Sequence, residues 1–228
     1  MKFGRPLIVM LTLAAAVAAC ASTVSAKVQQ LAGGYLVGSF PTGDWGKIAG
    51  FGLGLDGTDV LKRDTDKWFS IRSNFGLLYN FSRTVDVPAA NLGPSDKLSI
   101  ETKNWSVLFG IGPEFSAPNK AVTPFFFGTA GFDTYWTSSE LSGTANGAAY
   151  SAQHGDSRIA FAWGAGAGFR REIGANYMSE LSVEYRSGVE HEFLLPDDVN
   201  VSGGQVNANR SKHSSDQFII RLGTVFGK

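Results

Sequence analysis

This chain has a single cysteine, few charged residues and no excess of basic over acidic residues. Cys20 is the only cysteine among 228 residues, so no disulfide can form within the chain. The 20 Lys and Arg residues are matched by 20 Asp and Glu residues, without the basic excess typical of nucleic-acid-binding proteins. Charged residues make up only 18%, below the roughly 25% usual for soluble domains. Disulfide scaffolds and nucleic-acid binders are therefore excluded.

Long hydrophobic runs and helical periods are also lacking. The longest apolar stretch runs from Leu7 to Ala19, short of the ~20 residues that a spanning helix needs. Beyond it, no segment keeps a helical period with caps at both ends. The sequence therefore predicts neither a helical bundle nor a membrane protein built from helices.

The first 26 residues have the layout of a secretory signal peptide. Lys2 and Arg5 give a positive start, the apolar stretch follows, and Val24 and Ala26 form a cleavage site of small residues. We predict a signal peptide over 1–26 and a single barrel domain over 27–228. An alternative is a lipoprotein signal ending at Cys20, in which that cysteine would be acylated.

Glycine and aromatic residues are abundant, with 28 glycines and 12% aromatics. In the segment from Lys67 to Ser82, apolar residues, several of them aromatic, alternate with polar residues and glycine. Successive side chains of a strand point to opposite faces, so this segment predicts a strand with one apolar and one polar face. We predict eight such strands, over 31–40, 48–60, 67–82, 103–117, 124–137, 158–172, 177–190 and 218–226.

The predicted connections are alternately short and long. Leu61 to Asp66, Asn119 to Val122 and Ile173 to Asn176 are turn-like. Of the four connections on the opposite side, three are long and only Pro41 to Lys47 is brief. Short turns on one side and long loops on the other are typical of outer-membrane barrels, so we predict extracellular loops over 83–100, 140–157 and 192–214.

The same alternation would also suit a soluble, lipocalin-like barrel, in which the apolar face points inward. Here the polar face consists mostly of small residues with single charges, which suits a narrow lumen, and burying charges there requires pairing. In segment 124–137 we place Asp133 inward and Phe126, Phe132 and Trp136 outward. The predicted aromatic girdles contain Trp68, Trp105, Trp136, Tyr135, Tyr177 and Tyr185. The predicted lumen network contains Arg72, Glu114, Arg170, Glu180, Glu184, Arg186 and Arg221.

The chain resembles the small outer-membrane barrels of the OmpA/OmpX type. The resemblance rests on Phe40–Trp45, Gly50–Gly54 and the closing strand Phe218–Phe226, although Gly227 and Lys228 follow the terminal aromatic residue. It implies an all-β fold, an eight-stranded antiparallel up-and-down transmembrane barrel, in a bacterial outer membrane. It also implies contact with the lipid bilayer and lipopolysaccharide, and insertion by the outer-membrane machinery.

Three function classes stay open at this point. A structural, adhesive or loop-mediated binding role needs no catalytic group or cofactor, and a monomer suffices for it. A lipid-modifying hydrolase would need a nucleophile and a base, which His191 beside Ser187 or His213 beside Ser214, Ser215 and Asp216 could supply. A narrow passive channel is the third class. No metal-ligand spacing is present, and Gly164–Gly168 lies in a strand pattern rather than in a phosphate loop.

Overall fold

Eight antiparallel strands close into one barrel. The computed structural model describes residues 28–63, 68–88, 91–92, 96–117, 121–145, 147–174, 176–188, 190–202, 205–208 and 211–227. The predicted signal peptide and Cys20 lie outside these residues. The strand order around the barrel is β1-β12-β7-β6-β5-β4-β3-β2, and β1 pairs with both β12 and β2. The predicted eight-stranded up-and-down fold is confirmed.

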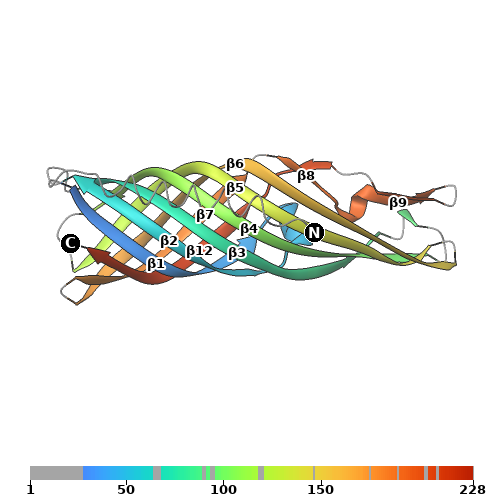
Figure 1. The fold of residues 1–228 in the computed structure, drawn as a ribbon, viewed down its shortest axis with the longest axis horizontal. Helices are drawn as coiled ribbons and strands as arrows, with labels where there is room; N and C mark the ends of the chain where they lie inside the picture. The colour runs from blue at the N-terminus through green and yellow to red at the C-terminus, as the bar shows by residue number, and fades with distance from the viewer. Residues whose placement is uncertain are drawn as a thin grey trace, which may run out of the picture.

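The barrel strands differ greatly in length. The strands are β1 (Val28–Pro41), β2 (Gly52–Arg63), β3 (Phe69–Asp86), β4 (Lys97–Ser116), β5 (Val122–Ala145), β6 (Ala148–Gly174), β7 (Tyr177–Gly188) and β12 (Gln217–Gly227). The hairpins β3–β4 and β5–β6 continue well past the ends of β2, β7 and β12, so they project from one end of the barrel (Figure 1).

The connection between β7 and β12 also lies at this projecting end. It contains four short strands, paired as β8 with β11 and β9 with β10. We call these strands, together with the projecting parts of β3–β6, the head, and we call the opposite end of the barrel the turn end (Figure 1). The elements of the connection are β8 (His191–Phe193), η2 (Pro196–Asp198), β9 (Val199–Ser202), β10 (Gln205–Ala208) and β11 (Ser211–His213).

The predicted long loops are wrong in part, because nearly all of 140–157 and both ends of 83–100, over 83–86 and 97–100, are strand, and 192–214 contains short strands of its own. The small and polar residues there lack a local alternation of apolar side chains. Strand pairing across the hairpins and an apolar core within the head hold these residues in extended conformation. That core gathers side chains from both hairpins and from the last connection, namely Val87, Leu98, Ile100, Leu141, Ala145, Leu194 and Val199.

The connection between β1 and β2 contains a short helix, α2 (Trp45–Ile48). The sequence predicts a strand from Ile48 onward, whereas β2 begins at Gly52. Trp45 and Ile48 are fully buried and pack with Tyr135 of β5. Burial of these two side chains in the mouth of the barrel therefore overrides the strand pattern at this position. Among the described residues, no helix has the length and apolar character needed to span a membrane.

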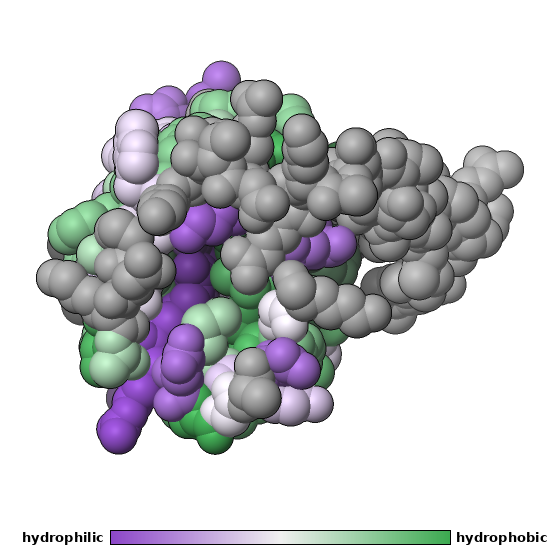
Figure 2. All heavy atoms as spheres, turned by 90° about the vertical axis from the view of Figure 1, so that its left-hand side faces the viewer, coloured by the Kyte–Doolittle hydropathy of each residue, from purple (hydrophilic) through white to green (hydrophobic). Residues whose placement is uncertain are grey.

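The outer surface of the barrel is apolar, and its interior contains both charged and apolar side chains. Phe126, Leu55 and Leu222 are 66%, 64% and 58% exposed on the outside. Figure 2, which looks onto the turn end, shows hydrophilic residues in the interior and hydrophobic residues along much of the border. One apolar cluster also fills part of the interior, formed by Leu31, Tyr35, Val37, Val60, Leu78, Leu108, Ile219 and Val225.

The predicted facing of β5 is correct for three residues. Asp133 is fully buried inside, while Phe126 and Phe132 are exposed outside. Trp136 is half-buried. Tyr135 was assigned to an outer girdle, which is wrong: it is 2% exposed and its hydroxyl contacts Asp133 in the interior. Because Tyr135 and Asp133 are two residues apart on one strand, they share a face.

Candidate functional site

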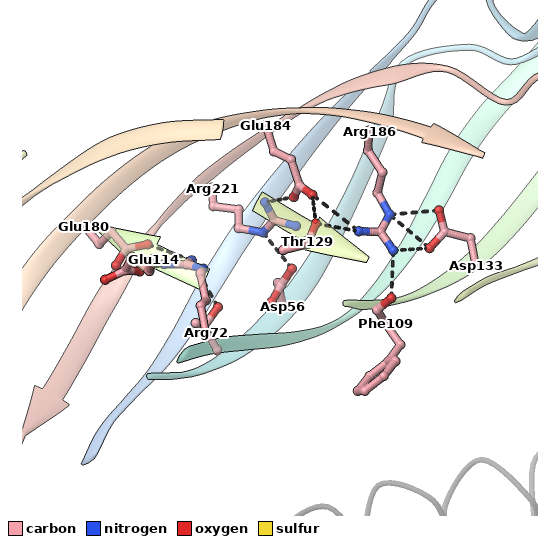
Figure 3. Close-up of polar contacts among 11 residues, drawn as sticks. Asp56, Arg72, Phe109, Glu114, Thr129, Asp133, Glu180, Glu184, Arg186 and Arg221 are labelled. Atoms are coloured by element: carbon pink, nitrogen blue, oxygen red, sulfur yellow. Dashed lines mark hydrogen bonds and ion pairs between the residues drawn. The ribbon is translucent and has the colours of Figure 1, made fainter. Parts of the chain in front are cut away.

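The lumen nearer the head contains a network of five charged side chains, which we call the upper network. It comprises Asp56, Asp133, Glu184, Arg186 and Arg221, contributed by β2, β5, β7 and β12 (Figure 3). Arg221 bridges two carboxylates, with Nε 2.7 Å from Asp56 Oδ2 and Nη1 2.6 Å from Glu184 Oε2. Arg186 also donates to the backbone oxygen of Phe109 at 2.7 Å.

A second network lies nearer the turn end and is called the lower network. It joins Arg72, Glu114, Arg170 and Glu180, and each arginine contacts both glutamates. Arg170 donates to both oxygens of Glu114 at 2.6 and 2.7 Å. The Arg170 guanidinium also lies 4.3 Å from the centre of the Phe125 ring. Bidentate pairing and ring contact compensate two buried cations for the loss of water.

All seven residues of the predicted lumen network lie in these two networks, at most 4% exposed. Asp56 and Asp133 also belong to the upper network, although the predicted lumen network does not contain them. The alternation of side chains along each strand could have identified both. Asp56 directly follows Leu55, which points outward like Leu53, so Asp56 points inward. Asp133 is already predicted to point inward. The division into two networks has no sequence signal, because it depends on the register between strands that are far apart in the chain.

Gly164 makes room for the upper network. A Cβ built on this residue would lie 2.1 Å from Glu184 Oε1, the atom that accepts from Thr129 at 2.8 Å, while Glu184 Oε2 accepts from Arg221. Gly164 lies on the inward face of β6 beside Arg186 of β7. This glycine therefore serves close packing inside the barrel.

The head-side mouth of the barrel is closed by α2. The Trp45 ring meets the Tyr135 ring edge-on, with centroids 5.4 Å apart. Ile48, Ala49, Ala160 and Leu195 complete this apolar cluster. Side chains from the first connection, from two strands and from the last connection thus fill the mouth above the upper network.

Polar contacts attach α2 to the barrel rim. Asp44 Oδ2 lies 2.7 Å from Nδ1 of His213, and Asp44 Oδ1 lies 2.7 Å from Nζ of Lys47. The hydrogen bond from Lys47, assisted by the one with His213, lowers the pKa of the Asp44 carboxyl. The backbone N–H of Thr42 donates to the backbone oxygen of Asp216 at 2.8 Å. Arg83 donates to the backbone oxygen of Gly46.

The serines near His213 have other partners. Ser187 and Ser214 donate to the two oxygens of Asp216 at 2.6 and 3.0 Å, and Ser215 donates to the Tyr135 hydroxyl at 2.8 Å. The structure thus divides the predicted grouping around His213 among Asp44, Asp216 and Tyr135. His154 lies exposed in the head, and the His191 side chain is outside the described residues. Among the described residues, no group of three or more His, Cys, Asp or Glu could hold a metal ion.

No protein-family model and no curated protein matches this sequence. Solved structures do match. The outer membrane protein OprG from Pseudomonas aeruginosa is 13% identical with a TM-score of 0.54, and the match covers 88% of this chain and 95% of OprG. Ail, the attachment invasion locus protein of Yersinia pestis, is 14% identical with a TM-score of 0.42, over 88% of this chain and 97% of Ail. At these identities only the fold is established, and on that ground the chain shares the barrel fold of the outer membrane protein OprG.

Proposed function

We propose that this chain is a bacterial outer-membrane barrel with a structural, adhesive or binding role carried by its head. The observation that supports this best is the inverted distribution of side chains. Large apolar residues cover the outside of a closed barrel, whereas nine charged residues are buried and paired inside it. In water this arrangement would expose the apolar surface, whereas in a bilayer the lipid chains cover it.

The barrel wall then lies in the bilayer and the head lies outside the cell. Aromatic pairs at the turn end, such as Tyr177 with Phe226 and Trp68 with Phe115, mark one membrane interface. Trp105 and Tyr79, with ring centroids 4.7 Å apart, lie toward the other interface. The saccharides of lipopolysaccharide would surround the base of the head.

The proposal includes the route to the membrane. Residues 1–26 would direct export and be removed, and residues 27–228 would form the barrel domain. The outer-membrane insertion machinery would recognise the closing strand, which presents Phe218, Leu222 and Phe226 outward. A monomer suffices, because the eight strands already close on each other.

The closed lumen favours an interactive role over a wide diffusion channel. Two ion-pair networks, an apolar cluster and the α2 side chains all lie in the interior. The head, in contrast, projects from the barrel and has its own apolar core (Figure 1). Extended hairpins packed on a core present a preformed surface, which reduces the entropy lost when a partner binds. We assign no catalytic role, since the serine hydroxyls nearest His213 donate to Asp216 and Tyr135.

Electrophoresis of the outer-membrane fraction, with and without boiling in detergent, tests the membrane assignment. A folded membrane barrel remains compact in detergent until heated, so we expect a change in mobility on boiling. Recovery of the protein in the soluble periplasm, with the same mobility before and after boiling, would contradict the proposal.

A further inference from the structure

Two polar side chains inside the barrel lack hydrogen-bond partners near α2. Asn104 is 0% exposed, and among the described residues neither its Nδ2 nor its Oδ1 has a partner. Ser106 is 1% exposed, and its Oγ likewise has no hydrogen-bond partner among the residues that the structure describes. Both lie on the inward face of β4, two residues apart. Leaving buried polar groups unpaired is unfavourable, so native structures almost always supply a partner.

The neighbours of these two residues place them below α2. Asn104 pairs in register with Asn80 of β3, whose Nδ2 donates 3.1 Å to the backbone oxygen of Gly50, just after the helix. Ser106 pairs in register with Tyr135 of β5, whose ring packs against Trp45. The strands on both sides of Asn104 and Ser106, β3 and β5, therefore both contact α2 or the residues just after it.

We propose that Asn104 and Ser106 form a binding site beneath α2 for a small neutral molecule that can both donate and accept hydrogen bonds. An amide presents one donor group and one acceptor, and a hydroxyl can act as either, so the two side chains complement such a guest. An ion is disfavoured, because Asp133, the next inward charged residue along β5 from Tyr135, is already paired with Arg186 of β7. The guest is water or a solute of about the size of acetamide, and both share this chemistry.

The first experiment measures the sign of a stability change in the full mature protein folded in lipid vesicles. Ser106→Ala removes the hydroxyl with almost no change of shape. If a guest binds it, the urea midpoint of unfolding falls, as it does for any buried hydroxyl that loses a partner. Ser39→Ala is the matched reference, because the buried Ser39 hydroxyl donates 2.6 Å to Gln217 Oε1. A midpoint that rises or stays unchanged in Ser106→Ala overturns the proposal.

A second experiment identifies the guest. Fluorine-labelled tryptophan gives one NMR signal for each of the 5 tryptophans, and Trp45→Phe identifies the signal of the buried tryptophan that packs on Tyr135. A saturable shift of that signal with acetamide, lost in Asn104→Leu, assigns the site to a small solute. With a lowered Ser106→Ala midpoint and no saturable shift, the guest is water. Asn207→Leu, on the exposed β9–β10 hairpin, is the control for Asn104→Leu and leaves the acetamide response unchanged.

Discussion

Arg186 and Asp133 form a fully buried bidentate ion pair across the lumen. The Nε and Nη2 atoms of Arg186 both donate to Asp133 Oδ1, at 3.0 and 2.6 Å, and Nε also lies 2.9 Å from Oδ2. Both side chains are 0% exposed. The Tyr135 hydroxyl donates to the same carboxylate at 3.2 Å. The pair therefore links the upper network to the aromatic contact that closes the mouth.

Removing one partner of this pair should be strongly destabilising. Asp133→Ala leaves the Arg186 guanidinium buried without its main counter-ion, and we expect the free energy of unfolding to fall by about 3–5 kcal/mol. Urea unfolding of the protein in lipid vesicles measures this change. Asp86→Ala, at an exposed position in the head, is the control and should stay within about 0.5 kcal/mol of the parent protein.

Replacing both partners together should recover much of that loss. In the double variant Asp133→Leu with Arg186→Met, no charge of this pair remains buried, and apolar pairs of similar volume often equal or exceed buried ion pairs in stability. We expect the double variant to be more stable than Asp133→Ala. If the double variant were less stable, packing around the pair rather than charge pairing would dominate at this position.

Trp45→Ala should loosen α2 without unfolding the barrel. Trp45 is 0% exposed and its ring packs on Tyr135, so the truncation removes most of the contact that holds the helix in the mouth. Because α2 lies outside the strand ladder, we expect hydrogen exchange at the amides of Gly46, Lys47 and Ala49 to accelerate at least tenfold. The amides of β7 serve as the internal control and should keep their protection. Equal acceleration in β7 would show that the helix and barrel unfold together.

The attachment of α2 should weaken in acid. Hydrogen bonding lowers the pKa of Asp44 in the folded protein, so its contribution to stability is present above the unfolded value of about 4. That contribution is lost as the pH falls through the lowered pKa of the folded state. We therefore expect the protection factors of the Gly46 and Ala49 amides, which are corrected for the intrinsic pH dependence of exchange, to fall over this acidic window. Asp44→Asn should have lower protection factors at neutral pH and a smaller change on acidification; an unaltered pH profile in this variant would contradict the assignment.

A charge on the outer wall should be costly only if the wall faces lipid. Phe75 lies outward near the middle of β3 and is 43% exposed. Phe75→Arg should lower the free energy of unfolding by about 2–4 kcal/mol in vesicles, the cost of a cation near the bilayer midplane. Ser142→Arg, outward on β5 in the head, is the matched control and should have little effect. Similar small effects at both positions would contradict membrane insertion.

The sequence by itself determined the number of barrel strands, their order along the chain and, where apolar and polar residues alternate clearly, the face that a side chain occupies. The alternation in β3 and β7 is local and has a period of two, so parity places Arg72, Glu180, Glu184 and Arg186 on one face without knowledge of any partner. The same parity applies to Asp56 and Asp133, which belong to the lumen network but were not included in the prediction.

Tertiary structure decided what local patterns do not encode. Ser142 and Ser151 lie in strands because they pair with each other across the β5–β6 hairpin, and because apolar residues from the distant last connection cover the opposite face. The site at the mouth depends on α2 folding inward so that Trp45 meets Tyr135. The contact of Trp45 with Tyr135 and the apolar contacts of the last connection with the hairpins join residues far apart in the chain. Barrel closure and strand register, rather than propensity, bring them together.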